Sequence, residues 1–246
     1  MERSRLVVGM IVVVASAAGA QSPATTLRVD VHPATSFLAG NMTRVSYVVA
    51  NDARSTDRLF EFAVRSPVPV WRLELPAPRD QYHGATQEGG KDVASWGWLE
   101  DMPRPGETSP VLAYEAIGLP GIVPYRALRY YGVREAQAVP DGSQELRFDK
   151  PGAEYIVGKT VGVVSLPLDL RPLALATRLR RLVDQACELG WINQRATCRY
   201  LRTNARPSLT AVRAFHRELV AQRGRAVSEA GFALLAPNAE FLLTKM

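Results

Sequence analysis

Residues 171–201 read RPLALATRLRRLVDQACELGWINQRATCRYL, and here the chain changes from one kind of structure to another. Apolar residues recur in this stretch at helical spacing and define one face of a helix: Leu175, Leu179, Leu182, Val183 and Ala186. Pro172 is typical of a first helical turn, and Gly190 is typical of a helix end. The pattern predicts a helix that opens an all-helical module over residues 172–246.

Three further helices complete this module in the prediction. Asn193 is a good N-cap for the second helix, and Ser208 precedes the third. Ser228 opens the fourth helix, whose apolar pattern contains Pro237. Because proline removes a backbone donor, we expect Pro237 to kink this helix or to split it in two.

The chain before this module carries a different periodicity. Leu27, Val29 and Val31 alternate with charged residues, which indicates a half-buried strand. Similar runs recur between turn residues, so we expect an antiparallel β-sandwich over residues 21–165 and a linker over residues 166–171. The polar, Gly-rich stretch 76–92 is predicted to be a loop. The two periodicities together predict two separate cores.

Residues 1–20 have the layout of a secretory signal peptide. Two arginines come first, an apolar run follows from Leu6 to Ala15, and small residues precede Gln21. The apolar run is too short to cross a hydrocarbon core of about 30 Å comfortably. We therefore expect a secreted or periplasmic protein that keeps no transmembrane anchor after cleavage.

Cys187 and Cys198 are the only cysteines. An even count at short separation in an exported chain indicates a disulfide. A metal site is not predicted, because the three histidines (His32, His83 and His216) lack ligand spacing to one another or to the thiols. No motif indicates a cofactor.

Charge is distributed unevenly along the chain. Residues 21–170 hold 15 Lys and Arg against 18 Asp and Glu, a net charge of −3, whereas residues 171–246 hold 13 against 5, a net charge of +8. Such a basic module suits an anionic cell-wall polymer or glycan. The arginines are spread over several helices, however, which favours the simpler interpretation that they solvate the outer faces of the bundle. No specific nucleic-acid partner is predicted, and no feature indicates an oligomeric state.

Trp96 and Trp98 lie two residues apart on a predicted strand, so both indoles share one face. Two interpretations remain open. The pair, with Tyr82 from the preceding loop, could form a platform on which sugars stack. The indoles could instead fill the space between the two sheets, because aromatic side chains supply much of a small core's buried area.

Two resemblances follow from these patterns. The run Cys187-Glu188-Leu189-Gly190-Trp191-Ile192 and the turn Ala221-Gln222-Arg223-Gly224-Arg225 resemble the FIMAH or FIVAR helical modules of bacterial secreted proteins. The β half resembles, more loosely, small immunoglobulin or fibronectin domains. These resemblances imply an accessory or binding role and supply no catalytic residues.

No catalytic constellation is evident. A G-x-S-x-G nucleophile elbow is missing, and the neighbouring carboxylates Glu100 and Asp101 lie at a predicted turn, where acids usually face solvent. The sequence therefore favours a non-catalytic exported bacterial protein that acts in binding or surface organisation. The alternatives are a carbohydrate-binding module using Trp96 and Trp98, and a hydrolase with an unrecognised site.

Overall fold

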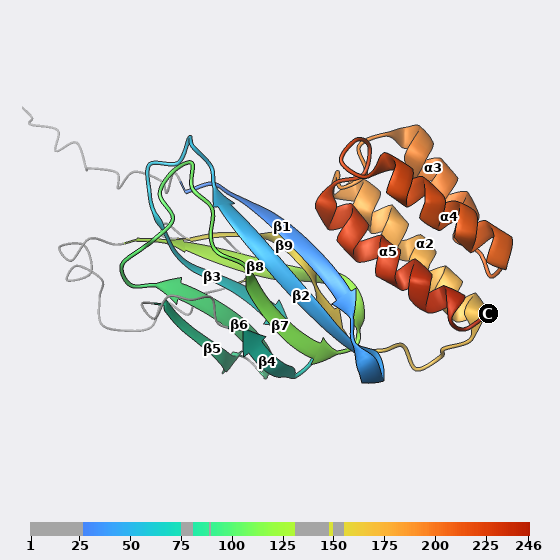
Figure 1. The fold of residues 1–246 in the computed structure, drawn as a ribbon, viewed down its shortest axis with the longest axis horizontal. Coiled ribbons are helices and arrows are strands. Elements are labelled where there is room, and N and C mark those ends of the chain that lie inside the picture. Colours follow the sequence, from blue (N-terminus) through green and yellow to red (C-terminus); the bar gives the residue numbers. More distant parts are fainter. Residues whose placement is uncertain (1–26, 75–80, 89, 131–147, 150–154) are drawn as a thin grey trace, which may run out of the picture.

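The computed structural model describes residues 27–74, 81–88, 90–130, 148–149 and 155–246, so the predicted leader lies outside the described residues. Within these ranges a two-sheet antiparallel β-sandwich is followed by four helices, which gather on one side of it (Figure 1). The strands are β1 (Val29–Phe37), β2 (Met42–Asn51), β3 (Leu59–Ser66), β4 (Val70–Glu74), β5 (Gln81–Glu88), β6 (Lys91–Trp98), β7 (Leu112–Ile117), β8 (Leu119–Arg129) and β9 (Tyr155–Val164). The helices are α2 (Pro172–Glu188), α3 (Arg195–Asn204), α4 (Leu209–Gln222) and α5 (Glu229–Leu243).

The strand order is β1-β2-β7-β4 in one sheet and β5-β6-β3-β8-β9 in the other, and all neighbours pair antiparallel. The expected alternation is clearest in β2, where Val45, Tyr47 and Val49 are fully buried and their neighbours are half-buried. This architecture confirms the predicted fold class, an antiparallel β-sandwich followed by a helical bundle with a disulfide.

The loop predicted over residues 76–92 is wrong in part, because it contains strand β5. Among the described strands it lies at the edge of its sheet and pairs only with β6, from Gln81 opposite Trp98 to Glu88 opposite Lys91. An edge strand buries little, so its residues carry no period-two apolar signal. The backbone pairing, rather than side-chain burial, makes this segment a strand.

The first helix follows the prediction, since all five residues of its apolar stripe are buried. The second does not begin as expected: Gln194 is its N-cap, and the side chain of Asn193 instead donates to the carbonyl oxygen of Arg225 at 3.3 Å. Ser228 does cap the fourth helix, where its Oγ accepts from the N–H of Gly231 at 3.2 Å. Helix α5 continues through Pro237 and is not split.

No helix in the described ranges combines the length and apolarity needed to cross a bilayer.

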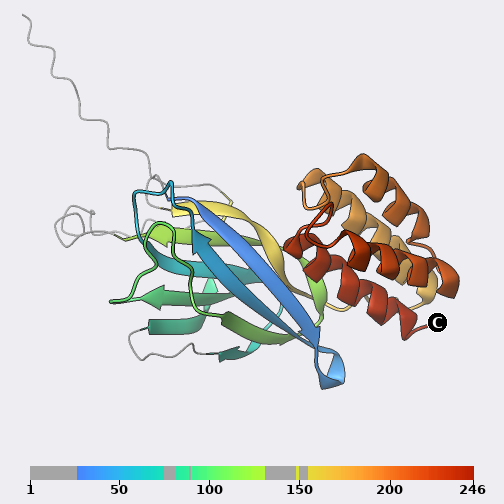
Figure 2. The ribbon, with the colours of Figure 1, turned by 45° about the horizontal axis from the view of Figure 1, so that its top comes forward.

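Helix α5 joins the two halves of the molecule. It lies beside the sandwich in both ribbon views, with contacts to β1, β8 and β9 (Figures 1 and 2). Leu119 and Val161 from the sandwich belong to the core of the helical bundle, and the rings of Phe37 and Phe241 lie 6.1 Å apart. The prediction of two separate cores therefore needs correction: there are two large apolar clusters and a small third one in the described residues, and the helical cluster extends into the sandwich.

Polar groups at this junction are paired across it. Pro237 has no N–H to offer the carbonyl of Ala233 one turn earlier, and the hydroxyl of Thr35 in β1 donates to that oxygen at 2.7 Å. The buried amide of Asn238 donates to the carbonyl of Pro120 in β8 at 3.0 Å. Arg178 donates to the same carbonyl at 3.1 Å, and burial lowers the pKa of its guanidinium. The proline therefore sits where the sandwich supplies the missing hydrogen bond.

Candidate anion-binding surface on the helical module

The structure places Trp96 and Trp98 in the core of the sandwich, where they are 1% and 0% exposed. The Trp96 indole stacks on Phe62 at 6.2 Å between ring centroids, and its Nε1 donates to the carbonyl of Glu74 at 3.3 Å. Neither indole presents a face to solvent, so the structure agrees with the interpretation that the indoles fill the space between the two sheets, and these two rings offer no exposed face on which a sugar could stack. Tyr82 belongs to β5, and its side chain lies outside the described part of the chain.

A different indole is exposed, and no sequence pattern singled it out. Trp71 is 65% exposed on β4, an edge strand. The register between β4 and β7 shifts between Val70 and Arg72, so Trp71 is the extra residue of a β-bulge. A bulge redirects the side chain it carries, and it cannot be read from a single strand because it depends on the partner's register.

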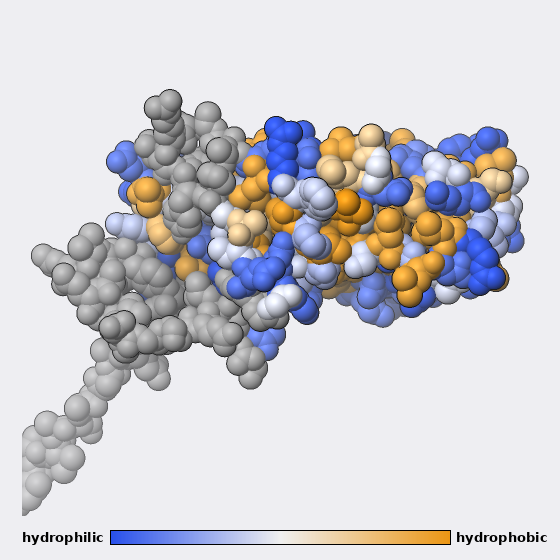
Figure 3. Space-filling model, turned by 90° about the horizontal axis from the view of Figure 1, so that it is seen from below, coloured by the Kyte–Doolittle hydropathy of each residue, from blue (hydrophilic) through white to orange (hydrophobic). Residues whose placement is uncertain are grey.

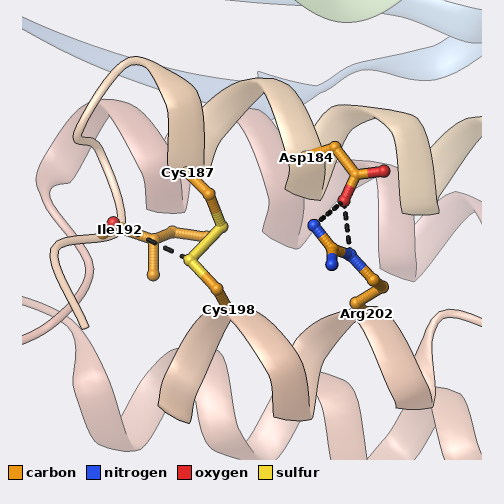
Figure 4. Close-up of a disulfide and its surroundings, with 5 residues drawn as sticks. All are labelled: Asp184, Cys187, Ile192, Cys198 and Arg202. Atoms are coloured by element: carbon orange, nitrogen blue, oxygen red, sulfur yellow. Dashed lines mark hydrogen bonds and ion pairs between the residues drawn. A yellow bond between two sulfur atoms is a disulfide. The ribbon is translucent and has the colours of Figure 1, made fainter. Parts of the chain in front are cut away.

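The predicted disulfide between Cys187 and Cys198 is present and links α2 to α3 (Figure 4). Cys187 lies near the end of α2, and Cys198 lies in the first turns of α3, with its Sγ 3.8 Å from the carbonyl oxygen of Ile192. Gly190, which has a positive φ of 73°, lets the chain reverse between them. The bridge therefore fixes the corner that joins two helices.

A pocket of about 490 Å³ lies against this corner. Three arginines of α3 line it, Arg195, Arg199 and Arg202, and their spacing of four and three residues puts them on one helix face. We refer to these three residues as the α3 arginine face. The pocket is open to solvent, and both disulfide-bonded cysteines line it, so its shape depends on the disulfide.

The charges of the α3 arginine face are only partly compensated. Arg202 binds the carboxylate of Asp184, with its Nε 2.6 Å from Oδ1, as Figure 4 shows. Arg195 and Arg199 are exposed and form no ion pair among the described residues. The backbone adds to this field, because α3 begins without a side-chain cap and without an acidic residue in its first turn. The free N–H groups of a helix start favour an anion.

Two other acidic residues of the bundle, Glu229 and Glu240, are paired away from this pocket. Arg223 binds Glu229 at 2.6 Å, and this hydrogen bond lowers the pKa of the Glu229 carboxyl. Glu240 lies 3.1 Å from the imidazole of His216. Neither carboxylate lines the pocket of the α3 arginine face. An anion that approached this pocket would therefore meet uncompensated positive charge.

The residues considered for catalysis are not assembled into a site. Glu100 and Asp101 are both exposed, as the turn predicted. Among the described residues, no cluster of three His, Cys, Asp or Glu side chains could hold a metal ion. His216 on α4 and Glu240 on α5 form a pair at the surface. The side chain of His83 is not among those that the structure describes.

Scans of the chain against family models and against curated proteins return no match. Among solved structures it is similar to an uncharacterized protein from Nocardia farcinica with an immunoglobulin-like fold, at 10% identity and a TM-score of 0.31, over 56% of this chain and 97% of that one. It is also similar to a GH20 exo-β-N-acetylglucosaminidase from Vibrio harveyi, at 10% identity and a TM-score of 0.29, over 61% of this chain and 22% of that enzyme. Scores this low carry no inference about function.

Proposed function

We propose that this chain is a non-catalytic exported bacterial protein that binds an anionic cell-wall polymer or glycan through the α3 arginine face. One observation carries the proposal: Arg195 and Arg199 are exposed beside a pocket and have no carboxylate partner among the described residues. Arginine presents several N–H donors in a fixed planar fork, which suits phosphate and carboxylate groups. The repeated anions of a polymer match a row of arginines along one helix.

The disulfide contributes by holding this surface in shape. A module of about 75 residues has a limited core, so a covalent link between α2 and α3 is physically useful. The link lies at the wall of the pocket and orders the start of α3, from which Arg195 and Arg199 project. A preordered site loses less side-chain and loop entropy when a ligand binds.

The export and family expectations belong to the same proposal. A secreted or periplasmic location would place the module where wall polymers occur and where disulfides persist. The likeness to FIMAH or FIVAR modules rests on residues such as 221–225, which span the end of α4 and the start of the connection to α5. Cleavage before Gln21 would be recognised from the mass of the exported protein.

Sedimentation of the mature protein with purified cell walls tests the binding. At about 20 mM salt, where screening is weak, the wild-type protein should sediment with the walls, and it should be released as salt is raised. R195E/R199E should weaken binding by about tenfold or more, because each exposed charge pair contributes up to about 1 kcal/mol and reversal adds repulsion.

The matched control is R213E/R217E, which makes the same charge change on the exposed surface of α4. If both variants lose binding equally, the net positive charge of the module as a whole causes the binding, and the α3 arginine face has no specific role. If the wild-type protein does not sediment at low salt, the proposed function is wrong.

A further inference from the structure

Three leucines are exposed where the chain passes from the sandwich to the bundle. Leu168 is 107% exposed, Leu170 is 37% exposed and Leu173 is 67% exposed. They lie within six residues, between the end of β9 and the first turn of α2. Single exposed apolar residues are ordinary on protein surfaces, but a contiguous group indicates an interaction site.

Exposed apolar residues from the sandwich lie beside this segment. β9 ends at Val164, which pairs with Leu119 next to Gly118 and Ile117, and Ile117 is 39% exposed. The N–H of Gly118 also donates to the carbonyl of Asn41 at 3.0 Å, in the connection that carries Leu38, which is 40% exposed. The ends of β7 and β9 and the β1–β2 connection therefore meet near the start of the linker.

The bundle extends the same surface on the other side. Helices α2 and α5 run antiparallel, because Arg178 meets Asn238 while Trp191 lies against Gly231. The end of α5 thus returns to the start of α2 and brings Met246, which is 44% exposed. We call the following set the leucine face: Leu38, Ile117, Leu168, Leu170, Leu173 and Met246. Figure 3 views the molecule from this side, where hydrophobic residues gather along the junction and across the bundle.

Basic side chains border the leucine face. Arg171 lies between Leu170 and Leu173, and its side chain is 84% exposed. Arg171 also binds the carboxylate of Asp169 at 2.7 Å, and this hydrogen bond lowers the pKa of that carboxyl to about 2. Arg181 lies in one pocket with Asp169, a residue of the linker. Arg171 and Asp169 therefore compensate each other, whereas Arg181 is exposed and has no ion pair among the described residues, so it supplies the uncompensated positive charge at this border.

We propose that the leucine face docks on a bilayer of anionic phospholipid, with the leucines in the interface and the arginines at the headgroups. An apolar surface bordered by basic residues has the composition of proteins that lie on membranes. Charge decides against a second copy of the chain as the occupant. Two copies joined through this face would bring together two helical modules that each carry a net charge of +8.

This inference goes beyond the proposed function, because it uses a different surface. The α3 arginine face belongs to the second helix of the bundle, whereas the leucine face is formed by the β1–β2 connection, the end of β7, the linker, the start of α2 and the residues after α5. In Figure 1 the linker runs along the lower side of the molecule, and α3 lies at the upper side of the bundle. A protein with both surfaces would hold a wall polymer above a membrane.

Flotation of the full mature chain with lipid vesicles tests the docking. Vesicles of phosphatidylglycerol mixed with phosphatidylcholine should carry the protein upward, and vesicles of phosphatidylcholine alone should carry much less. L168S/L173S should lower the partition coefficient by about tenfold or more, because it removes two of the most exposed apolar side chains. Circular dichroism should show an unchanged fold, since surface substitutions alter stability little.

The control L99S/V220S removes two apolar side chains of comparable exposure, 60% and 54%, outside the leucine face, and it should bind vesicles like the wild-type protein. R195E/R199E should keep most of its vesicle binding even where it loses wall binding. A failure of the wall-binding proposal can therefore be distinguished from a failure of the membrane-docking proposal. Docking would be overturned if the wild-type protein stayed with the soluble fraction, or if L168S/L173S and the control floated equally. Self-association that depends on Leu168 and Leu173, with no effect of vesicles, would assign the face to a second copy and overturn it too.

Discussion

The hydrogen bond from Thr35 to Ala233 gives the sharpest test of how the two halves are joined. It satisfies a carbonyl that Pro237 leaves without its usual partner in α5. Thr35→Val keeps the shape of the side chain and removes the donor. A neutral hydrogen bond contributes about 1 kcal/mol, and a carbonyl left unpaired at a half-buried junction raises the cost to about 1–2 kcal/mol.

Urea unfolding, followed by tryptophan fluorescence and far-UV circular dichroism, would measure this loss as a lower midpoint. In a chain of this size each kcal/mol lowers Tm by about 2–4 °C, so a parallel thermal scan should shift by about 2–8 °C. Both probes should move together if the junction opens with the whole fold. Fluorescence that moves alone would show that the sandwich unfolds separately.

A double-mutant cycle isolates the reason for the loss. Pro237→Ala restores an N–H that can reach the carbonyl of Ala233 within α5. In that background Thr35→Val should cost clearly less, with a coupling of about 1 kcal/mol between the two positions. Equal costs in the two backgrounds would refute the idea that Thr35 replaces the hydrogen bond which Pro237 removes.

Three further predictions follow from other parts of the structure. Replacing both cysteines with serine should lower the free energy of unfolding by about 3 kcal/mol, the loop-closure value for this separation, and thermal unfolding with and without reductant would check it. Gly118→Ala should destabilise the fold strongly, because a Cβ there would lie 2.1 Å from the carbonyl oxygen of Val164. Gly190→Ala, where a Cβ meets nothing within 4 Å, should cost only about 1 kcal/mol for its positive φ, and urea unfolding of both variants gives the comparison. Burial raises the pKa of Tyr47 and of Tyr114, so their contribution to stability is complete below the unfolded pKa near 10 and is lost as pH rises above it; a tyrosinate titration at 295 nm should show both rings ionising only with unfolding.

The regular elements could be predicted from the sequence because their burial is one-sided. A strand such as β2 buries every second residue, and a helix such as α2 buries one stripe, so each leaves its period in the sequence. Strand β5 leaves no such period, because it is an edge strand held by backbone pairing with β6. The exposure of Trp71 could not be predicted from the sequence for a related reason. A β-bulge depends on how two strands pair, and the sequence of one strand does not show that pairing.

The burial of Trp96 and Trp98 shows why residue type alone could not place the binding site. Spacing put both indoles on one face of a strand, and it did so correctly, but it could not say which face points into the sandwich. The position of the α3 arginine face could not be predicted either, although the net positive charge of the helical module was evident from the sequence. Only the fold separates Arg202, which has a carboxylate partner, from Arg195 and Arg199.

Helix α5 carried a signal that the prediction did not use. A helix that packs on one neighbour keeps a polar face, whereas most residues of α5 between Gly231 and Leu242 are buried, so it is apolar almost all round. That composition requires packing partners on all sides of the helix, and the bundle covers only the sides of α5 that face α2 and α4. The other partner is the sandwich, through β1 and β8. Pro237 is tolerated in the middle of this helix for the same reason, because the surface that covers α5 also supplies the hydroxyl of Thr35.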